Sequence, residues 1–302
     1  MDLGTNTFHL LIAEGRIGNF REIIHEHIAV KLGEGGINKD IIVPEAFERG
    51  IETMKKFRSQ IDACDVHQLR AIATSSLRNA ANGVDFIGRV KQETGIAIEI
   101  IDGKREAAFI YNGVKAAGFL SAESSIILDI GGGSVEFIIG NKEGILWKQS
   151  FEIGAARLME MFHHTDPIPS ASIEALNLYI ENTLCELFLA TKEMPVYTLI
   201  GSSGAFETFA ELAALKRNDS FDLKSTKNYV FDLGELLTIT DELVLSSHAE
   251  REANQAIIPV RVDMIVTASL ITRYIIQKLG ITNVALCTYS LKEGVLAEMM
   301  NH

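Results

Sequence analysis

Apolar, mostly β-branched residues form two runs in the middle of the chain, separated by three consecutive glycines. The first run, residues 126–130, carries Asp129 near its end, and the second, residues 135–139, carries Glu136. Apolar runs of this length between turn signals are typical of buried strands. Glu136 lies two residues beyond Ser134 and therefore on the same face of the pleat. The pattern predicts a hairpin with one carboxylate on each side of a glycine turn.

The glycines Gly131, Gly132 and Gly133 would weaken a strand unless another group must approach the backbone closely. Glycine permits positive φ and leaves the backbone N–H groups open to an anion. Asp129 would stand at the carboxyl end of its strand, where one or two carboxylates commonly hold a hydrated Mg²⁺ together with phosphate oxygens. The alternative is an ordinary tight hairpin whose aspartate has no role.

The N-terminus repeats this arrangement. Residues 2–7 read DLGTNT and are followed by an apolar run at residues 8–13, so that Asp2 and Asp129 begin two similar motifs 127 positions apart. This internal repeat indicates a duplicated domain that faces itself across a cleft. Few residues precede Asp2, and we expect either that upstream apolar residues are missing or that the first strand is stunted. His9 lies within the apolar run and is expected to pack in the core.

The same patterns predict the remaining elements. Helices are expected at residues 44–64, 84–94, from 103, 155–162, 169–192 and 291–300, with further helices from 228 to 279. Strands are expected at residues 22–24, 29–32, 69–73, 97–101, 144–152, 196–200 and 284–287, with a hairpin turn at 16–19 and surface loops at 33–36 and 216–227. Residues 33–36 either line a site or only connect two elements.

Glycine- and hydroxyl-rich turns follow four of these strands, at Gly4, Thr74, Gly131 and Gly201. Because ligands in open α/β sheets bind beyond the carboxyl ends of the strands, we expect the four turns to converge. The turns after Thr74 and Gly201 also open helices, and a helix N-terminus attracts phosphate.

Composition restricts the function classes. The chain has 302 residues, enough for two domains, and a net charge of −12, which argues against broad binding of nucleic acid or anionic membranes. No apolar run approaches the roughly 18 residues of a membrane span, and no signal peptide is visible. Three scattered cysteines, Cys64, Cys185 and Cys287, fit reduced thiols in a cytoplasmic protein. A polyanionic substrate would require a locally positive site.

Several ordered motifs together resemble the Ppx/GppA family of exopolyphosphatases and guanosine pentaphosphate phosphohydrolases. They are residues 2–10 (DLGTNTFHL), 32–35 (LGEG), 73–80 (ATSSLRNA), 103–107 (GKREA), 129–136 (DIGGGSVE), 201–204 (GSSG), 261–265 (RVDMI) and 291–296 (LKEGVL). The resemblance implies an α/β fold of two duplicated actin-like (ribonuclease H-like, ASKHA) domains with an interdomain cleft. We expect these domains at residues 1–120 and 121–290, with the C-terminal helix, residues 291–302, packing back on the first.

The resemblance further implies hydrolysis of terminal phosphoanhydride bonds with Mg²⁺ (or Mn²⁺). Glu106 and Glu136 match the glutamates that position and activate water, while Asp129, with Asp2 at the repeated position, would bind the metal. Phosphate contacts are expected at Thr5, Asn6, Thr7, Arg78, Gly131, Gly132, Gly133, Ser134, Gly201, Ser202, Ser203 and Gly204. The substrates would be polyphosphate or guanosine penta- or tetraphosphate, and a homodimer is expected.

Two residues depart from the family pattern. Arg105 stands where many members have a second acid, and Lys292 replaces the usual arginine. The length resembles the short, two-domain members, which favours short polyphosphate chains over processive action. Two other classes stay open: a sugar-kinase-like phosphotransferase, and a non-catalytic alarmone or nucleotide sensor or actin-type assembly protein. The presence of both Glu106 and Glu136 favours an enzyme.

Overall fold

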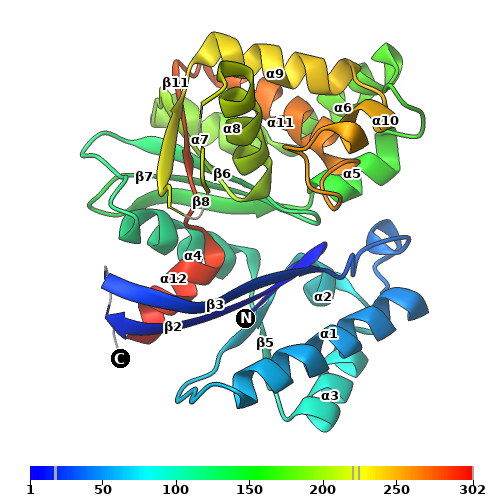
Figure 1. Ribbon diagram of the computed structural model, residues 1–302. Coiled ribbons are helices and arrows are strands. Elements are labelled where there is room, and N and C mark those ends of the chain that lie inside the picture. Colours follow the sequence, from blue (N-terminus) through cyan, green and yellow to red (C-terminus); the bar gives the residue numbers. More distant parts are fainter. Residues whose placement is uncertain (17–18, 220, 224, 301–302) are drawn as a thin grey trace.

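Two mixed β-sheets, one from each half of the chain, form the framework of the computed structural model, which describes residues 1–16, 19–219, 221–223 and 225–300. Figure 1 shows the two sheets stacked, with helices α4 (Gly103–Ala116) and α12 (Leu291–Met300) between them. We call the first sheet with its helices the N-terminal lobe and the second sheet with its helices the C-terminal lobe.

The N-terminal lobe has a five-stranded sheet in the order β3-β2-β1-β4-β5. Its strands are β1 (Asp2–Leu3), β2 (Thr7–Arg16), β3 (Asn19–Ala29), β4 (Ala71–Ala73) and β5 (Ile98–Ile100). The first three strands are antiparallel, whereas β4 and β5 run parallel to β1. The side chains of β2 alternate, so that Phe8, Leu10 and Ile12 are buried in the core and the residues between them face the other side.

The C-terminal lobe repeats this topology in the order β10-β11-β9-β6-β7-β8. The strands are β6 (Ser125–Ile130), β7 (Val135–Gly140), β8 (Ile145–Phe151), β9 (Thr198–Ser202), β10 (Asn228–Phe231) and β11 (Asn283–Cys287). Strands β6, β7, β8, β9 and β11 correspond to β1 to β5 in order and direction, and β10 is an added antiparallel edge strand. The predicted duplicated actin-like fold is therefore confirmed.

Helices cover the outer faces of both sheets. The N-terminal lobe contains η1 (Ile37–Lys39), α1 (Pro44–Asp62), α2 (Ser75–Asn79) and α3 (Gly83–Thr94). The C-terminal lobe contains α5 (Ala155–Phe162), α6 (Ser170–Thr183), α7 (Cys185–Glu193), α8 (Gly204–Arg217), α9 (Leu233–Leu245), α10 (His248–Ala253) and α11 (Met264–Leu279). In α1 the predicted apolar face is the buried one, because residues such as Ile51, Met54 and Phe57 recur at helical spacing.

Helices α4 and α12 pack tightly against each other. A Cβ at Gly294 would overlap the carbonyl oxygen of Phe109, and one at Gly113 would overlap that of Ser290, so both contacts require glycine. Phe109 and its neighbours also share an apolar cluster with Ile127, Ile138 and Ile200 of the second sheet. Helix α4 is thus anchored to the C-terminal lobe, although it follows the strands of the N-terminal one. The division into domains at residues 120 and 290 stays a prediction.

Some predicted elements differ from the structure. The helix expected at residues 169–192 is divided at Leu184, whose φ of −92° and ψ of 20° bend the chain while its side chain stays fully buried. The strand expected at 29–32 ends at Ala29, and β10 replaces part of a segment expected to be helical. The predicted turn at 16–19 and loop at 216–227 include residues 17, 18, 220 and 224, which lie outside the described residues. Within the described part of the chain, no helix has the length and apolar character needed to cross a bilayer.

Candidate active site

The two repeated turns lie directly against each other at the boundary between the lobes. In each turn the amide of the first glycine donates to the carbonyl oxygen three residues later, Gly4 to Thr7 at 3.2 Å and Gly131 to Ser134 at 3.0 Å. A Cβ at Gly132 would overlap the side-chain amide of Asn6. The same backbone geometry therefore occurs twice, once on each side of a single junction.

The glycines of the second turn serve close approach, not a left-handed backbone. A Cβ at Gly133 would lie 2.5 Å from Ser75 Oγ and 2.8 Å from Thr5 Oγ1. None of Gly131, Gly132 and Gly133 has a positive φ, so the conformational freedom that glycine permits is not used in this turn. Their function is to let the two turns meet without intervening side chains.

A cavity of about 870 Å³ opens at this junction. It is lined by most of the residues predicted from the sequence: Asp2, Thr5, Asn6, Thr7, Glu106, Asp129, Gly131, Gly132, Gly133, Ser134, Glu136, Ser203 and Gly204. Three of the predicted phosphate contacts, Arg78, Gly201 and Ser202, are not among the lining residues. All four predicted turns thus contribute residues to the cavity, and these residues come from both lobes.

Buried carboxylates dominate one wall of the cavity. Asp129 and Glu136 are directly opposite each other on β6 and β7, so their side chains extend from the same face of the hairpin. Glu106 approaches from the first turn of α4. The exposed fractions of these residues are 7% for Asp129, 1% for Glu136 and 6% for Glu106. Four acidic groups, with Asp2, share one enclosed space.

Burial raises the pKa of each of these carboxyl groups. For Glu136 the pKa lies well above 4.5, because burial is reinforced by the nearby charges of Glu106 and Asp129. Burial also raises the pKa of Glu106, although the guanidinium of Arg78 opposes the shift. Burial raises the pKa of Asp129 as well. Groups with such perturbed pKa values, gathered in one cavity, are typical of a functional site.

Arg78 lies behind Glu106 instead of in the cavity. Its Nη1 donates to Glu106 Oε2 at 3.0 Å and to the carbonyl oxygen of Ile101 at 3.2 Å, while Nη2 donates to Glu152 Oε1 at 2.9 Å. The guanidinium therefore contacts a carboxylate that lines the cavity and a carboxylate of the other lobe. In this structure it positions Glu106 instead of standing open to a phosphate.

The turn at residues 201–204 contains the most strained backbone near the cavity. Ser203 has φ 70° and ψ −173°, a region that is essentially restricted to glycine and costs a non-glycine residue about 1–3 kcal/mol. The turn opens α8, and the preceding Ser202 lies beside Asp129 in the parallel ladder. Gly201 and Ser202 are the last two residues of β9, whereas Ser203 and Gly204 follow them and line the cavity.

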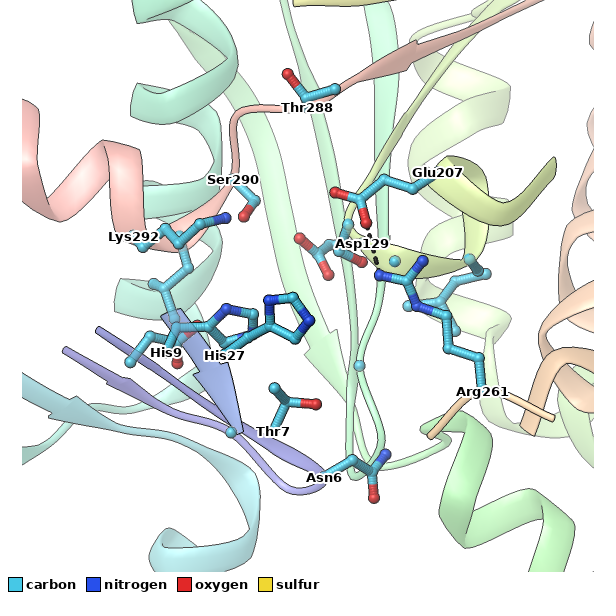
Figure 2. Close-up of a pocket in the computed structure, with 18 of the residues that line it drawn as sticks. Asn6, Thr7, His9, His27, Asp129, Glu207, Arg261, Thr288, Ser290 and Lys292 are labelled. Atoms are coloured by element: carbon cyan, nitrogen blue, oxygen red, sulfur yellow. Dashed lines mark hydrogen bonds and ion pairs between the residues drawn. The ribbon is translucent and has the colours of Figure 1, made fainter. Parts of the chain in front are cut away.

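Several side chains that the sequence analysis did not assign to the site also line the cavity. Figure 2 shows Lys292, His9 and His27 on one side of the cavity, and the Arg261–Glu207 ion pair, 2.6 Å between Nη2 and Oε2, on the other. The expectation that His9 packs in the core is wrong, because its side chain lines the cavity. Its Nδ1 is buried and has no hydrogen-bond partner among the described residues. The alternation along β2 was the available signal, since His9 falls on the face opposite Phe8 and Leu10.

His9 is also the counterpart of Glu136 in the repeat. Asp2 pairs with His9 across β1 and β2 in the same register in which Asp129 pairs with Glu136. Of the two residues that depart from the family pattern, Lys292 lines the cavity and pairs with Glu293 at 3.2 Å. Arg105 instead pairs with Glu99, is largely exposed, and does not line the cavity. The loop at residues 33–36 contacts Thr5 from behind and is a connector.

The donors present fit a magnesium-type site that is completed by substrate and water. No group of three or more His, Cys, Asp or Glu side chains in the described part of the chain is arranged to hold a metal ion alone. Mg²⁺ commonly needs only one or two carboxylates together with phosphate oxygens and waters. Asp129 and Asp2 supply two carboxylates, and Asp2 Oδ1 is buried without a hydrogen-bond partner among the described residues. That oxygen is therefore available to a cation.

Several known proteins are similar to this chain over most of its length. The chain is 31% identical over 292 residues to the bifunctional 3-dehydroquinate synthase/phosphatase of Fusobacterium nucleatum (93% of this chain, 43% of the relative). It is 26% identical over 301 residues to the guanosine-5'-triphosphate,3'-diphosphate pyrophosphatase of Vibrio vulnificus (100% and 59%), so it spans about half the length of these two curated relatives. The structure of an exopolyphosphatase from Cytophaga hutchinsonii is similar with a TM-score of 0.96 at 40% identity, covering 99% of this chain and 96% of that one. The sequence model of the Ppx/GppA phosphatase family matches residues 11–302, and the chain belongs to this family.

Proposed function

We propose that this protein hydrolyses terminal phosphoanhydride bonds and releases orthophosphate from short inorganic polyphosphate, from guanosine pentaphosphate, or from both. Membership of a phosphatase family supports the reaction class, and the exopolyphosphatase and pyrophosphatase relatives support the two substrates. The observation that carries the proposal is the meeting of the two repeated turns in one cavity with Glu106 and Glu136.

Phosphoryl transfer depends mainly on alignment and on neutralising charge around the phosphate. In the proposed mechanism, the backbone N–H groups of the turns and the hydroxyls of Thr5 and Ser134 hold the terminal phosphate. A water oxygen attacks the phosphorus, the anhydride P–O bond breaks, and its electron pair leaves with the bridging oxygen. A carboxylate accepts the proton of the water.

Glu136 is our candidate for that carboxylate. Its Oε1 accepts a hydrogen bond from Ser150 Oγ at 2.6 Å, which fixes the orientation of the side chain. The raised pKa makes the ionised form a stronger base, closer to the strength that proton transfer near neutral pH requires. Glu106, in the first turn of α4, would share the orientation of the water.

We assign the metal position to Asp129, with Asp2 as a second ligand for Mg²⁺ or Mn²⁺. When bound there, a divalent cation would neutralise part of the phosphate charge and make the phosphorus easier to attack. Lys292 and Arg261 also line the cavity, but each pairs with a glutamate, so binding of a polyanion there would depend on the cation to offset the acidic lining. A cytoplasmic location and a homodimer of the 33.2 kDa chain are further parts of the proposal; measurement of the native mass tests the dimer.

A phosphate-release panel tests the proposal. Wild-type protein and Glu136→Gln would be compared on tripolyphosphate, long polyphosphate, guanosine pentaphosphate and ATP, with and without Mg²⁺. We expect metal-dependent release of orthophosphate from at least one of the first three substrates, and its loss in the variant. ATP-dependent transfer of phosphate to a sugar, or tight alarmone binding without release, would instead support the phosphotransferase or the sensor.

A further inference from the structure

A carboxylate of the C-terminal lobe reaches across the boundary between the lobes to the residues behind Glu106. Glu152 directly follows β8, and its two oxygens accept hydrogen bonds from the N-terminal lobe, Oε1 from Arg78 Nη2 at 2.9 Å and Oε2 from Ser75 Oγ at 2.7 Å. Its side chain is 42% exposed, and it does not line the cavity. Glu152 therefore makes no direct contact with the cavity.

Arg78 connects Glu152 to Glu106. The guanidinium of Arg78 donates through Nη1 to Glu106 Oε2 and through Nη2 to Glu152 Oε1. A planar guanidinium that is held on both sides by carboxylates has little freedom to rotate. One oxygen of Glu106 is thus held in place by a side chain whose other contact belongs to the opposite lobe.

Glu152 is itself held by the C-terminal lobe. Its Oε2 also accepts from Arg157 Nη2 at 3.3 Å, and Arg157 donates through Nε to the carbonyl oxygen of Gly133 at 3.3 Å and through Nη1 to that of Ile37 at 2.9 Å. The chain of contacts therefore runs from the glycine turn through Arg157 and Glu152 to Arg78 and Glu106. It links the turn that we propose binds phosphate to a carboxylate that we propose orients water.

We propose that Glu152 is a positioning residue that completes the active centre from the second lobe. Through Arg78 it fixes the orientation of Glu106, so that Glu106 is correctly aimed only while the two lobes are in contact at this point. This inference rests on the role proposed above for Glu106. It adds a coupling between contact of the lobes and orientation of that carboxylate.

A second carboxylate offers a matched control. Glu160 of α5 crosses the same boundary, with Oε1 accepting from the amide of Gly35 at 3.1 Å and Oε2 from Asn38 Nδ2 at 3.3 Å. Within the described part of the chain, Glu160 forms neither a hydrogen bond nor an ion pair with Arg78. If contact between the lobes alone mattered, removing the charge of Glu160 and that of Glu152 would have equal effects.

The test compares Glu152→Gln with Glu160→Gln. A glutamine at position 152 can still accept from Arg78 while its NH₂ donates to Ser75 Oγ. The variant therefore removes the negative charge that holds the guanidinium of Arg78, and the hydrogen bond from Arg157, at little change in side-chain volume. We expect kcat to fall about tenfold or more, the scale typical for loss of a residue that orients a functional group, with KM changed less than twofold. Glu160→Gln should leave both constants within twofold, and both variants should keep the wild-type Tm within a few degrees.

A double-mutant cycle shows whether Glu152 acts through Arg78. In an Arg78→Gln background, Glu152→Gln should change kcat less than twofold, whereas Glu160→Gln should have the same small effect in both backgrounds. Additive losses, or equal losses in the two glutamate variants, would overturn the inference. A crystal structure of Glu152→Gln provides a readout that is independent of activity. If Arg78 and Glu106 keep their 3.0 Å contact and rotamers there, the inference is wrong while the proposed function stands.

Discussion

Replacing Glu136 by glutamine should lower activity and raise stability at the same time. The side chain is 1% exposed, and glutamine has nearly the same volume, so no cavity is created. The glutamine oxygen can still accept the hydrogen bond from Ser150 Oγ. What is lost is the negative charge that we propose takes the proton from water. We expect kcat to fall by at least about 30- to 150-fold, equivalent to about 2–3 kcal/mol of transition-state stabilisation.

The effect on stability follows from the pKa. Burial and the neighbouring carboxylates raise the pKa of Glu136 well above its usual 4.5 in the folded state. The folded protein therefore binds a proton more tightly than the unfolded chain, and the free energy of unfolding falls as the pH rises from about 4.5 toward the folded pKa. Each unit of elevation corresponds to about 1.4 kcal/mol. Glutamine removes this cost, so the variant should be at least about 1 kcal/mol more stable than wild type at pH 8, and less so at pH 5.

Phosphate release at saturating substrate and urea unfolding at pH 5 and pH 8, without added metal, measure the two effects. Glu143→Gln, on the exposed turn between β7 and β8, is the matched control and should change neither quantity. Near-wild-type turnover of Glu136→Gln would refute its proposed role. If Glu136→Gln were less stable than wild type at pH 8, our inference that the buried charge of Glu136 destabilises the folded protein would be wrong.

Three further predictions concern the metal, the junction of the turns and the core. Asp129→Asn should sharply raise the Mg²⁺ concentration needed for half-maximal activity, and an unchanged metal titration would remove Asp129 from the metal site. Gly132→Ala should force the two turns apart, lowering the free energy of unfolding by about 1–3 kcal/mol and lowering kcat, because its Cβ would overlap the facing amide. Gly88→Ala, in the interior of α3 with open space around it, is the control and should stabilise by about 1 kcal/mol in the same urea titration. Asp166→Asn should destabilise by about 1.5–3 kcal/mol, measured in the same way, because the guanidinium of Arg251, 1% exposed, loses its charged partner but keeps its backbone acceptors; a loss under 1 kcal/mol would contradict this.

Sequence patterns predicted the elements whose structure depends mainly on residues close to one another in the chain. The two hairpins and the register of Asp129 with Glu136 follow from runs of apolar residues that alternate across a pleat on either side of a turn. Helix α1 follows from its periodicity and from Pro44 at its start. The bend at Leu184 could not be predicted in this way, because no glycine or proline marks it and its leucine side chain is fully buried like others of the helix.

Contacts between distant parts of the chain could not be predicted in this way. The Arg261–Glu207 pair joins α8 to the segment before α11, and the Glu152–Arg78 contact joins the two lobes. Nothing in the local sequence around Arg78 distinguishes a guanidinium that meets phosphate from one that meets two carboxylates. The structure decides between them, because it shows which side chains surround each nitrogen.

Asp2 pairs with His9 in the same register in which Asp129 pairs with Glu136, so the two hairpins can be compared residue by residue within one molecule. Because the two hairpins pair in the same register, a chemical difference between them comes from the side chains that differ at matching positions, such as His9 and Glu136. A protein built in this way can change the reactivity of one side without redesigning its scaffold. The double variant His9→Glu, Glu136→His exchanges the two side chains, and its activity would show how far the reaction depends on which hairpin carries the carboxylate.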